Sequence, residues 1–337
     1  MLSFSVLIPV YNGERFIARA LDSVLAQTWR HFELLVCDDA STDGTAAILR
    51  RYAERDPRIR LLFHGQNKQG FTTRNDLARA ARFPYCTYLD ADDALAPDFL
   101  ERAAAILSRR EYDILEFPIT VMNRNPLRRL IFRGNPKTEL EGDAVFDFLF
   151  RKKAPACPFA KTIRTDVLVR SLLPDEPLII SDDIALAVPL YYHAKSYRYT
   201  GGKPAYRYHL GAGGWGKRIY TLQQFEEINR NLAATRRKVL AFFREKQLPR
   251  DVDARFYRTF NTAHVLELIS DGRIENDDRT AACRIFLKYR TPEELTELFS
   301  QAGILLPDTP VSTGMKIGFK FVSEICKRWL KRLSRMR

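Results

Sequence analysis

The sequence of 337 residues contains only five cysteines, and no two of them form a Cys-x-x-Cys pair. Their odd number and wide spacing indicate neither a disulfide framework nor a zinc site, and they favour a reducing compartment such as the cytoplasm. No apolar run approaches the ~20 residues of a membrane-spanning helix. No basic segment precedes the first apolar run, residues 3–10, so this run is expected to be a strand rather than a signal peptide.

Outside the C-terminal end, neither sign of charge is in large excess. The net charge is +13, and residues 315–337 contribute +7 of it through eight Lys or Arg against the single acid Glu324. The remainder is only modestly basic, which argues against a protein that binds nucleic acid over its whole surface. With 46% hydrophobic residues, the composition is that of a globular protein of one or two domains.

The first 120 residues alternate between short apolar runs and stretches with helical spacing. Strands are expected at residues 4–10, 31–37, 59–63, 85–89 and 113–117, and helices at residues 15–26, 45–53, 72–81 and 98–108. This alternation indicates βαβ units and a mostly parallel sheet covered by helices on both faces. The fold class is therefore predicted to be α/β, and ligands of such sheets bind outside the carboxyl ends of the strands.

Three of the predicted strands end in polar residues. The first strand ends in residues 9–13, the second in residues 38–44 and the fourth in residues 90–93. Each segment alone could be turn chemistry, since Asn, Asp, Ser and Gly are common turn residues. Together they predict a binding site, because the carboxyl ends of parallel strands meet at one edge of the sheet.

The last of these segments, Asp90-Ala91-Asp92-Asp93, concentrates negative charge directly after an apolar run. Carboxylates this close repel one another, and a cation relieves that repulsion. An Asp-x-Asp arrangement of oxygen ligands suits Mg²⁺ or Mn²⁺, and Mg²⁺ usually completes its coordination with substrate phosphates. A solvated acidic turn that caps the next helix explains the same residues equally well.

The second half of the chain has a different pattern. Helices are expected at residues 222–247, 254–270, 278–289 and 292–302, after a glycine-rich boundary at residues 211–216. We therefore expect an α/β domain in residues 1–215, a helical C-terminal region in residues 216–310 and a tail helix in residues 311–337.

The tail helix is expected to be amphipathic and basic. Its apolar residues recur at every fourth position, and Lys and Arg lie on another face: the apolar set is Ile317, Phe321, Ile325, Trp329 and Leu333. Helices of this kind bind anionic membrane surfaces, which is the expectation for residues 313–337. Docking of the helix on its own domain, or contact with a second copy, explains the pattern equally well.

Several ordered segments resemble the family 2 glycosyltransferases of the GT-A fold. They are residues 5–12 (SVLIPVYN), 21–28 (LDSVLAQT) and 32–43 (FELLVCDDASTD), then Asn67 to Gly70, Arg74-Asn75 and residues 89–93 (LDADD). The resemblance covers residues 3–120 and, more loosely, residues 155–215. It implies a GT-A catalytic domain and inverting transfer of a sugar from a nucleotide sugar, usually linked to UDP.

The resemblance also implies roles for individual residues. Pro9, Tyr11 and Asn12 would line the nucleotide pocket, and Asp39, with Asp38 beside it, would accept a hydrogen bond from the uracil ring. Arg74 would approach the base or the diphosphate. Asp90 would lie near the ribose, and Asp92 would bind the Mn²⁺ or Mg²⁺ ion that bridges the diphosphate.

An acidic pair later in the chain, Asp182-Asp183, resembles the Glu-Asp motif that this family carries at the start of a helix. In this correspondence Asp183 is the general base that deprotonates the acceptor hydroxyl as it attacks. From the residues alone, the favoured explanation is that Ser181 caps a helix with acids in its first turn.

The glycine-rich segment 211–216 is followed by Lys217 and Arg218 and matches two nucleotide-binding patterns formally. Arg218 stands where a Ser or Thr of a phosphate-binding loop must reach Mg²⁺, so those patterns are disfavoured. A loop that closes over a nucleotide sugar fits better, with Lys217 or Arg218 meeting phosphate. His209, just before the loop, is expected either to contact the diphosphate or to pack at a strand end.

The sequence therefore predicts a metal-dependent hexosyl- or hexosaminyltransferase. The acceptor is expected to be a glycan or lipid-linked glycan of surface polysaccharide synthesis, in the cytoplasm or peripherally on the inner face of the cell membrane. A sugar nucleotidyltransferase of related fold is an alternative, disfavoured because no Gly-rich, Arg-containing loop follows the first strand. A second alternative is a membrane-associated protein that binds nucleotide sugars without turning them over.

Overall fold

The computed structural model describes residues 1–122, 130–132, 138–150, 156–178, 181–209, 219–249, 251–259, 274, 279–291 and 293–295. It divides into two compact units, Met1–Gly214 and Trp215–Arg337. Lys217, Arg218 and the tail helix predicted at residues 311–337 lie outside the described residues, so the division at residue 310 stays a prediction. None of the helices in the described part is both long and apolar enough to span a membrane.

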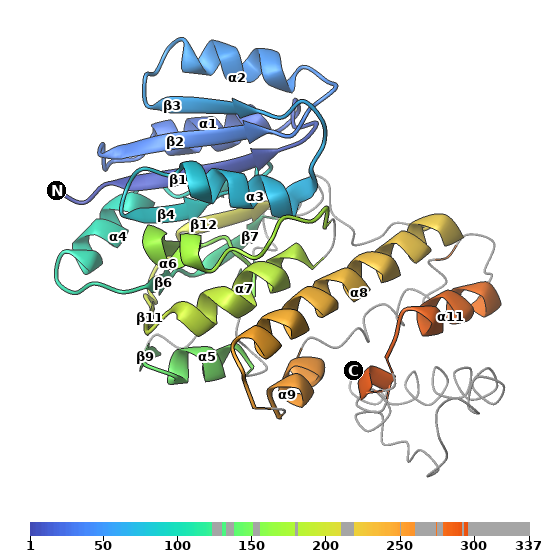
Figure 1. Ribbon diagram of the computed structural model, residues 1–337. Coiled ribbons are helices and arrows are strands. Elements are labelled where there is room, and N and C mark those ends of the chain that lie inside the picture. The colour runs from blue at the N-terminus through green and yellow to red at the C-terminus, as the bar shows by residue number, and fades with distance from the viewer. Residues whose placement is uncertain are drawn as a thin grey trace. The chain divides into compact units, whose positions relative to one another are not determined.

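In the described part of the first unit, eight strands form the main sheet (Figure 1). Their order is β3 (Ile59–Phe63), β2 (Phe32–Asp38), β1 (Phe4–Val10), β4 (Tyr85–Tyr88), β10 (Lys161–Arg164), β6 (Ile114–Glu116), β11 (Ser196–Tyr199) and β9 (Glu139–Glu141). The strands β3, β2, β1 and β4 are parallel to one another, whereas β10 is antiparallel to both of its neighbours. The predicted α/β class and the five predicted strands are confirmed.

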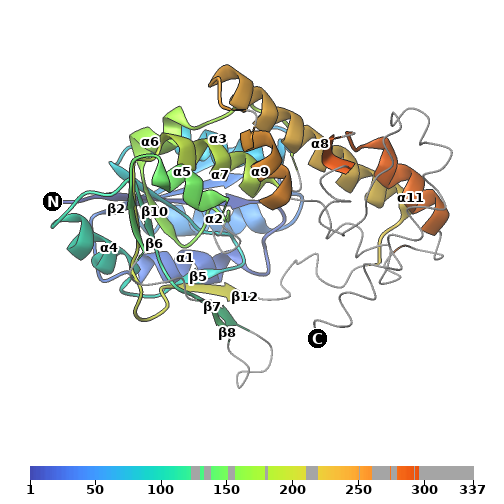
Figure 2. The same ribbon diagram turned by 90° about the horizontal axis from the view of Figure 1, so that it is seen from below.

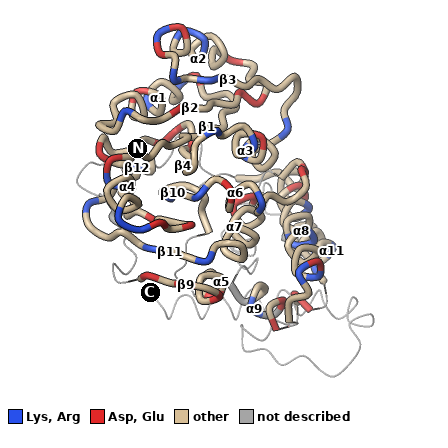
Figure 3. The backbone as a smooth tube through the Cα atoms, turned by 60° about the vertical axis from the view of Figure 1, so that its left-hand side comes forward, with Lys and Arg blue, Asp and Glu red and all other residues tan. Residues whose placement is uncertain are grey.

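Helices cover both faces of this sheet, as Figure 2 shows. They are α1 (Ile17–Leu25), α2 (Thr45–Ala53), α3 (Gln69–Ala80), α4 (Phe99–Leu107), α5 (Ala144–Leu149), α6 (Thr165–Arg170) and α7 (Asp182–His193). Alternate residues of β1, such as Val6 and Ile8, are buried in one cluster with Leu21 of α1 and Phe99 of α4. The opposite face carries α3, with α6 and α7 packed beside it (Figure 3).

A second, smaller sheet lies next to the acidic segment. Its order is β5 (Ala94–Leu95), β12 (Tyr206–His209), β7 (Ile119–Met122) and β8 (Leu130–Phe132). Because β5 directly follows residues 90–93 and pairs with β12, the chain near residue 206 returns to the edge of the main sheet where the polar strand ends meet. This pairing brings together residues that are more than a hundred positions apart.

The described part of the second unit is helical, as predicted. It contains α8 (Leu222–Glu245), α9 (Asp251–Thr259) and α11 (Arg279–Lys288). The helix α8 begins with a capping box, in which Thr221 and Gln224 each bond the backbone N–H of the other. Phe225, at its first turn, is fully buried.

Candidate functional site

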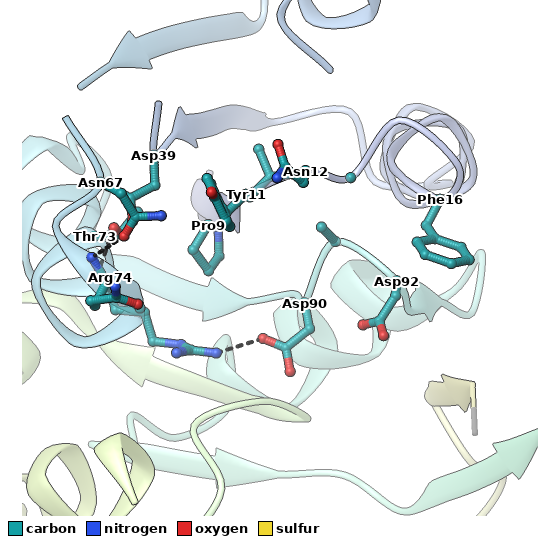
Figure 4. A pocket seen from close by; sticks show the side chains of 15 residues that line it. Pro9, Tyr11, Asn12, Phe16, Asp39, Asn67, Thr73, Arg74, Asp90 and Asp92 are labelled. Carbon is teal, nitrogen blue, oxygen red and sulfur yellow. Dashed lines mark hydrogen bonds and ion pairs between the residues drawn. The ribbon is translucent and has the colours of Figure 1, made fainter. Parts of the chain in front are cut away.

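A cavity of about 330 Å³ opens at the carboxyl ends of β1, β2 and β4 (Figure 4). Its lining comes from the three polar strand ends and from the start of α3, and comprises Pro9, Val10, Tyr11, Asn12, Gly13, Phe16, Asp39, Asn67, Gln69, Gly70, Thr73, Arg74, Asp90, Ala91 and Asp92. Seven residues to which the family resemblance assigns nucleotide or metal binding therefore lie together: Pro9, Tyr11, Asn12, Asp39, Arg74, Asp90 and Asp92. The predicted residues Asp38, Asp183 and His209 are not part of this lining.

Hydrogen bonds between the first two strand ends shape one wall of the cavity. Asn12 adopts the left-handed conformation with φ of 50°, which Asn tolerates better than most residues. Its side-chain oxygen accepts from the N–H of Thr42 at 2.8 Å, and its own N–H donates to the Ser41 hydroxyl at 2.9 Å. The buried carboxylate of Asp38 accepts from the N–H of Ser41 at 2.9 Å, so Asp38 supports this loop from behind.

The neighbouring acid, Asp39, faces the cavity and is held at one oxygen. Its Oδ1 lies 2.7 Å from Nδ1 of His64 and accepts from the N–H of Lys68 at 2.8 Å. Nothing in the sequence pattern singled out His64. A signal was present: His64 directly follows β3, and β3 pairs with β2, the strand that ends in the acidic turn. This position could have identified His64 as a neighbour of Asp39.

The acidic segment divides into residues that face the cavity and one that does not. Asp93 is fully buried and accepts hydrogen bonds from the Tyr206 hydroxyl at 2.7 Å and from the N–H of His209 at 2.8 Å. Burial raises the pKa of Asp93 to about 7. The interpretation of Asp93 as a helix cap is wrong, because α4 begins at Phe99 after Asp98. Asp93 instead fastens the acidic turn to β12.

Arg74 joins the acidic segment to the start of α7. Its Nη2 donates to Oδ1 of Asp90 at 2.8 Å, and its Nη1 donates to Oδ2 of Asp182. Burial alone would lower the pKa of Arg74, but the charges of Asp182 and Asp90 outweigh it and raise that pKa. The side chain is 14% exposed and connects three elements at the floor of the cavity.

Removal of this guanidinium should destabilise the first unit. In Arg74→Met the partly buried carboxylates of Asp90 and Asp182 lose their cation, and we expect a loss of about 3 kcal/mol in the free energy of unfolding. Urea unfolding measures it. The control is Arg79→Met, whose ion pair with Asp175 is about two-fifths exposed and is expected to contribute less than about 1 kcal/mol. Equal losses in the two variants would contradict the prediction.

Asp183 lies in the first turn of α7, beside the Arg74 bridge. The preceding residue Ser181 is left-handed with φ of 61°, and its side chain makes no capping hydrogen bond, so the interpretation that Ser181 caps this helix is wrong. Oδ1 of Asp183 accepts from the N–H of Ile184 at 3.0 Å. Burial, and then the charge of Asp182, raise the pKa of Asp183 to about 6. A carboxylate with such a pKa suits proton abstraction near neutral pH.

An aromatic stack that the sequence did not predict lies beside the acidic turn. Phe159 stacks on Tyr206 with ring centroids 4.9 Å apart and on Tyr208 at 5.8 Å. Lys161, close to this stack in the sequence, is buried: its Nζ donates to the carbonyl of Cys157 at 2.8 Å and lies 3.3 Å from a carboxylate oxygen of Glu116. Lys161 therefore supports the backbone of this segment from inside.

The donor set of the cavity fits a divalent ion that arrives with a phosphate substrate. The described residues contain no group of three or more His, Cys, Asp or Glu side chains arranged to hold a metal ion. Asp90 and Asp92 line the same cavity, and burial followed by the charge of Asp90 raises the pKa of Asp92. One or two carboxylates with substrate phosphates and water are the usual ligands of Mg²⁺.

Comparison with known proteins is consistent with this geometry. The family model for glycosyl transferase family 2 matches residues 5–169.

Two relatives come from Bacillus subtilis (strain 168). The putative glycosyltransferase EpsE is 37% identical over 113 residues, which are 33% of this chain and 41% of EpsE. The putative teichuronic acid biosynthesis glycosyltransferase TuaG is 32% identical over 129 residues, 38% of this chain and 51% of TuaG. The matched region thus spans about half of these relatives or less.

The structural likeness extends further along the chain. The crystal structure of S. aureus TarS 1-349 in complex with UDP-GlcNAc has a TM-score of 0.56 and 20% sequence identity, covering 91% of this chain and 93% of that one. At this identity the likeness is one of fold, and it confirms the predicted GT-A architecture followed by a helical region.

Proposed function

Residues 5–169 are a glycosyl transferase family 2 domain, and on that premise we propose that the chain transfers a sugar from a UDP-sugar to a hydroxyl group of a glycan or lipid-linked glycan. The observation that carries the proposal is the convergence of Asp39, Arg74, Asp90 and Asp92 on one cavity at the carboxyl ends of parallel strands. That position is where α/β sheets bind nucleotides.

Each part of the cavity matches a part of a nucleotide sugar. The carboxylate of Asp39 accepts a hydrogen bond from the base, and Asp90, held by Arg74, lies near the ribose. Asp92 would hold a Mn²⁺ or Mg²⁺ ion, which when bound offsets the charge of the diphosphate leaving group. The TarS complex with UDP-GlcNAc supports UDP as the nucleotide and a hexosamine as one candidate sugar.

The reaction is a displacement at the anomeric carbon. The acceptor oxygen forms a bond to that carbon while the bond to the diphosphate oxygen breaks, and the nucleoside diphosphate leaves with the electron pair. Asp183 takes the proton of the acceptor hydroxyl. Attack from the side opposite the leaving group inverts the configuration of the anomeric carbon.

The relatives point to a class of product. The name of TuaG refers to teichuronic acid biosynthesis, and one crystal structure of TarS 1-349 contains UDP-GlcNAc. The name of TuaG supports a polysaccharide as the acceptor, and the TarS complex supports a UDP-sugar as the donor.

A donor panel tests the function. We expect UDP-sugars with Mn²⁺ or Mg²⁺ to raise the melting temperature more than GDP-, ADP- or CDP-sugars, because ligands that bind only the folded state stabilise it. Chromatography should then detect release of UDP in the presence of metal. Binding without UDP release, for every acceptor tried and for water, would favour the non-catalytic alternative. Consumption of UTP and a sugar 1-phosphate with release of pyrophosphate would favour a nucleotidyltransferase.

A further inference from the structure

We propose that His64 is a positioning residue that orients the carboxylate of Asp39 to accept a ring N–H from the nucleotide base. The inference rests on the proposed function, because it assigns Asp39 to the base of the donor. His64 does not line the cavity, but in this proposal it determines which nucleotide base the cavity binds.

Among the described residues, the hydrogen bonds of the Asp39 side chain are all made by one carboxylate oxygen. Nδ1 of His64 lies 2.7 Å from Oδ1, and the N–H of Lys68 donates to the same oxygen at 2.8 Å. Within the described part of the chain, Oδ2 is therefore the oxygen left for a ligand. In Figure 4, Asp39 lies at one end of the cavity and Asp92 at the other, which separates a base end from a metal end.

The imidazole is itself held from its far side. Nε2 of His64 lies 3.1 Å from Oδ2 of Asp76 on α3 and 3.5 Å from Sγ of Cys37 on β2. Nζ of Lys68 donates to the same oxygen of Asp76 at 3.2 Å. The His64 side chain is only 9% exposed, so the ring is fixed between the end of β2 and α3. Rotation of the Asp39 carboxylate would therefore break its hydrogen bond to a ring that is held on both sides.

A fixed carboxylate distinguishes bases by one atom. An ionised carboxylate only accepts hydrogen bonds. Uracil presents a ring N–H at N3, and guanine presents one at N1, whereas cytosine and adenine present an unprotonated nitrogen at the matching edge. A lone pair facing a carboxylate is repelled, so we expect UDP to bind about tenfold to hundredfold more tightly than CDP.

Two variants distinguish loss of the orientation of the Asp39 carboxylate from simple loss of the imidazole ring of His64. In His64→Asn the amide nitrogen can take the place of Nδ1 and donate to Asp39. In His64→Gln the longer amide takes the place of Nε2, so it reaches Asp76 and leaves Asp39 without this donor. Both variants remove the imidazole and its capacity for charge, which makes them matched controls for one another.

Titration calorimetry of the full chain with UDP and with CDP, in Mg²⁺, is the measurement. We expect His64→Gln to lose about tenfold or more in UDP affinity with little change for CDP, so that the preference for UDP nearly disappears. We expect His64→Asn to restore most of the UDP affinity. Equal behaviour of the two variants, or equal losses for UDP and CDP, would overturn the assignment and leave His64 a packing residue.

A second measurement covers the case in which neither variant folds. In the unmodified chain labelled with ¹⁵N-histidine, UDP should shift the ring resonances of His64, whereas CDP should leave them in place. Shifts of the same size with both nucleotides would refute the proposal. If the variants or the His64 resonances behave as expected but the wild-type chain releases no UDP from any donor, the proposed function fails while the role of His64 stands. If turnover is present and the two variants are alike, only the role of His64 fails.

Discussion

Replacement of Asp183 by Asn is expected to lower kcat by about 10²- to 10⁴-fold, the range typical for loss of a general base. The amide keeps the size of the side chain and can still accept from the N–H of Ile184, the bond that Oδ1 makes at 3.0 Å. Only the ability to take the acceptor proton is lost. The dissociation constant of UDP should change little, because Asp183 does not line the cavity.

The pH dependence gives the same prediction an independent test. The pKa of Asp183 is raised to about 6, first by burial and then by the charge of Asp182. A general base works only when ionised, so activity should fall about tenfold per pH unit below pH 6 and level off above it. Residual turnover by Asp183→Asn should lack this acidic limb. If the acidic limb persists in Asp183→Asn, the limb reports the titration of a group other than Asp183.

Asp182→Asn is the matched control for this variant. It also removes one negative charge, but from the neighbouring carboxylate, which pairs with Arg74. We expect weaker donor binding and lower stability, with the acidic limb of the pH profile retained but moved to lower pH, because the charge of Asp182 helps to raise the pKa of Asp183. If Asp183→Asn keeps more than about a tenth of the wild-type kcat, or if Asp182→Asn loses as much, Asp183 is not the base.

The strands and the cavity lining could be predicted from the sequence because they depend on neighbours in the chain. An apolar run followed by Asn, Asp or Gly encodes both a buried strand and its polar end, and parallel strands bring such ends to one edge. The structure confirms the strands and brings Asp39, Asp90 and Asp92 to one cavity, whereas Arg74, which also lines it, is expected there only from the family resemblance. The roles of these residues stay predictions.

The partners of these residues could not be predicted in the same way. Asp93 bonds Tyr206 and His209, more than a hundred positions away, because β12 pairs with β5. Arg74 meets Asp182 across a similar distance in the sequence. No periodicity records such a contact, since it depends on how the second sheet and α7 pack against the first half of the chain.

The second large effect is expected at Asp92. In Asp92→Ala we expect loss of metal-dependent UDP binding and a fall in donor turnover of about 10²- to 10⁴-fold, since a divalent ion contributes several kcal/mol to stabilising charge on a phosphoryl leaving group. Calorimetry with UDP in Mn²⁺, and in excess chelator, is the measurement. In chelator the wild-type chain should resemble the variant.

The acidic turn explains why Asp92 should matter more than its surroundings. Burial and the charge of Asp90 raise the pKa of Asp92, so its ionised form is costly until a cation arrives, whereas Asp90 already has the guanidinium of Arg74. Asp98→Ala is the control, because that carboxylate lies a few residues later and is 48% exposed. It should leave metal-dependent binding unchanged. If Asp92→Ala still binds UDP in a metal-dependent way, the ion must be held elsewhere, and Asp92 serves only to shape the turn that Asp93 fastens to β12.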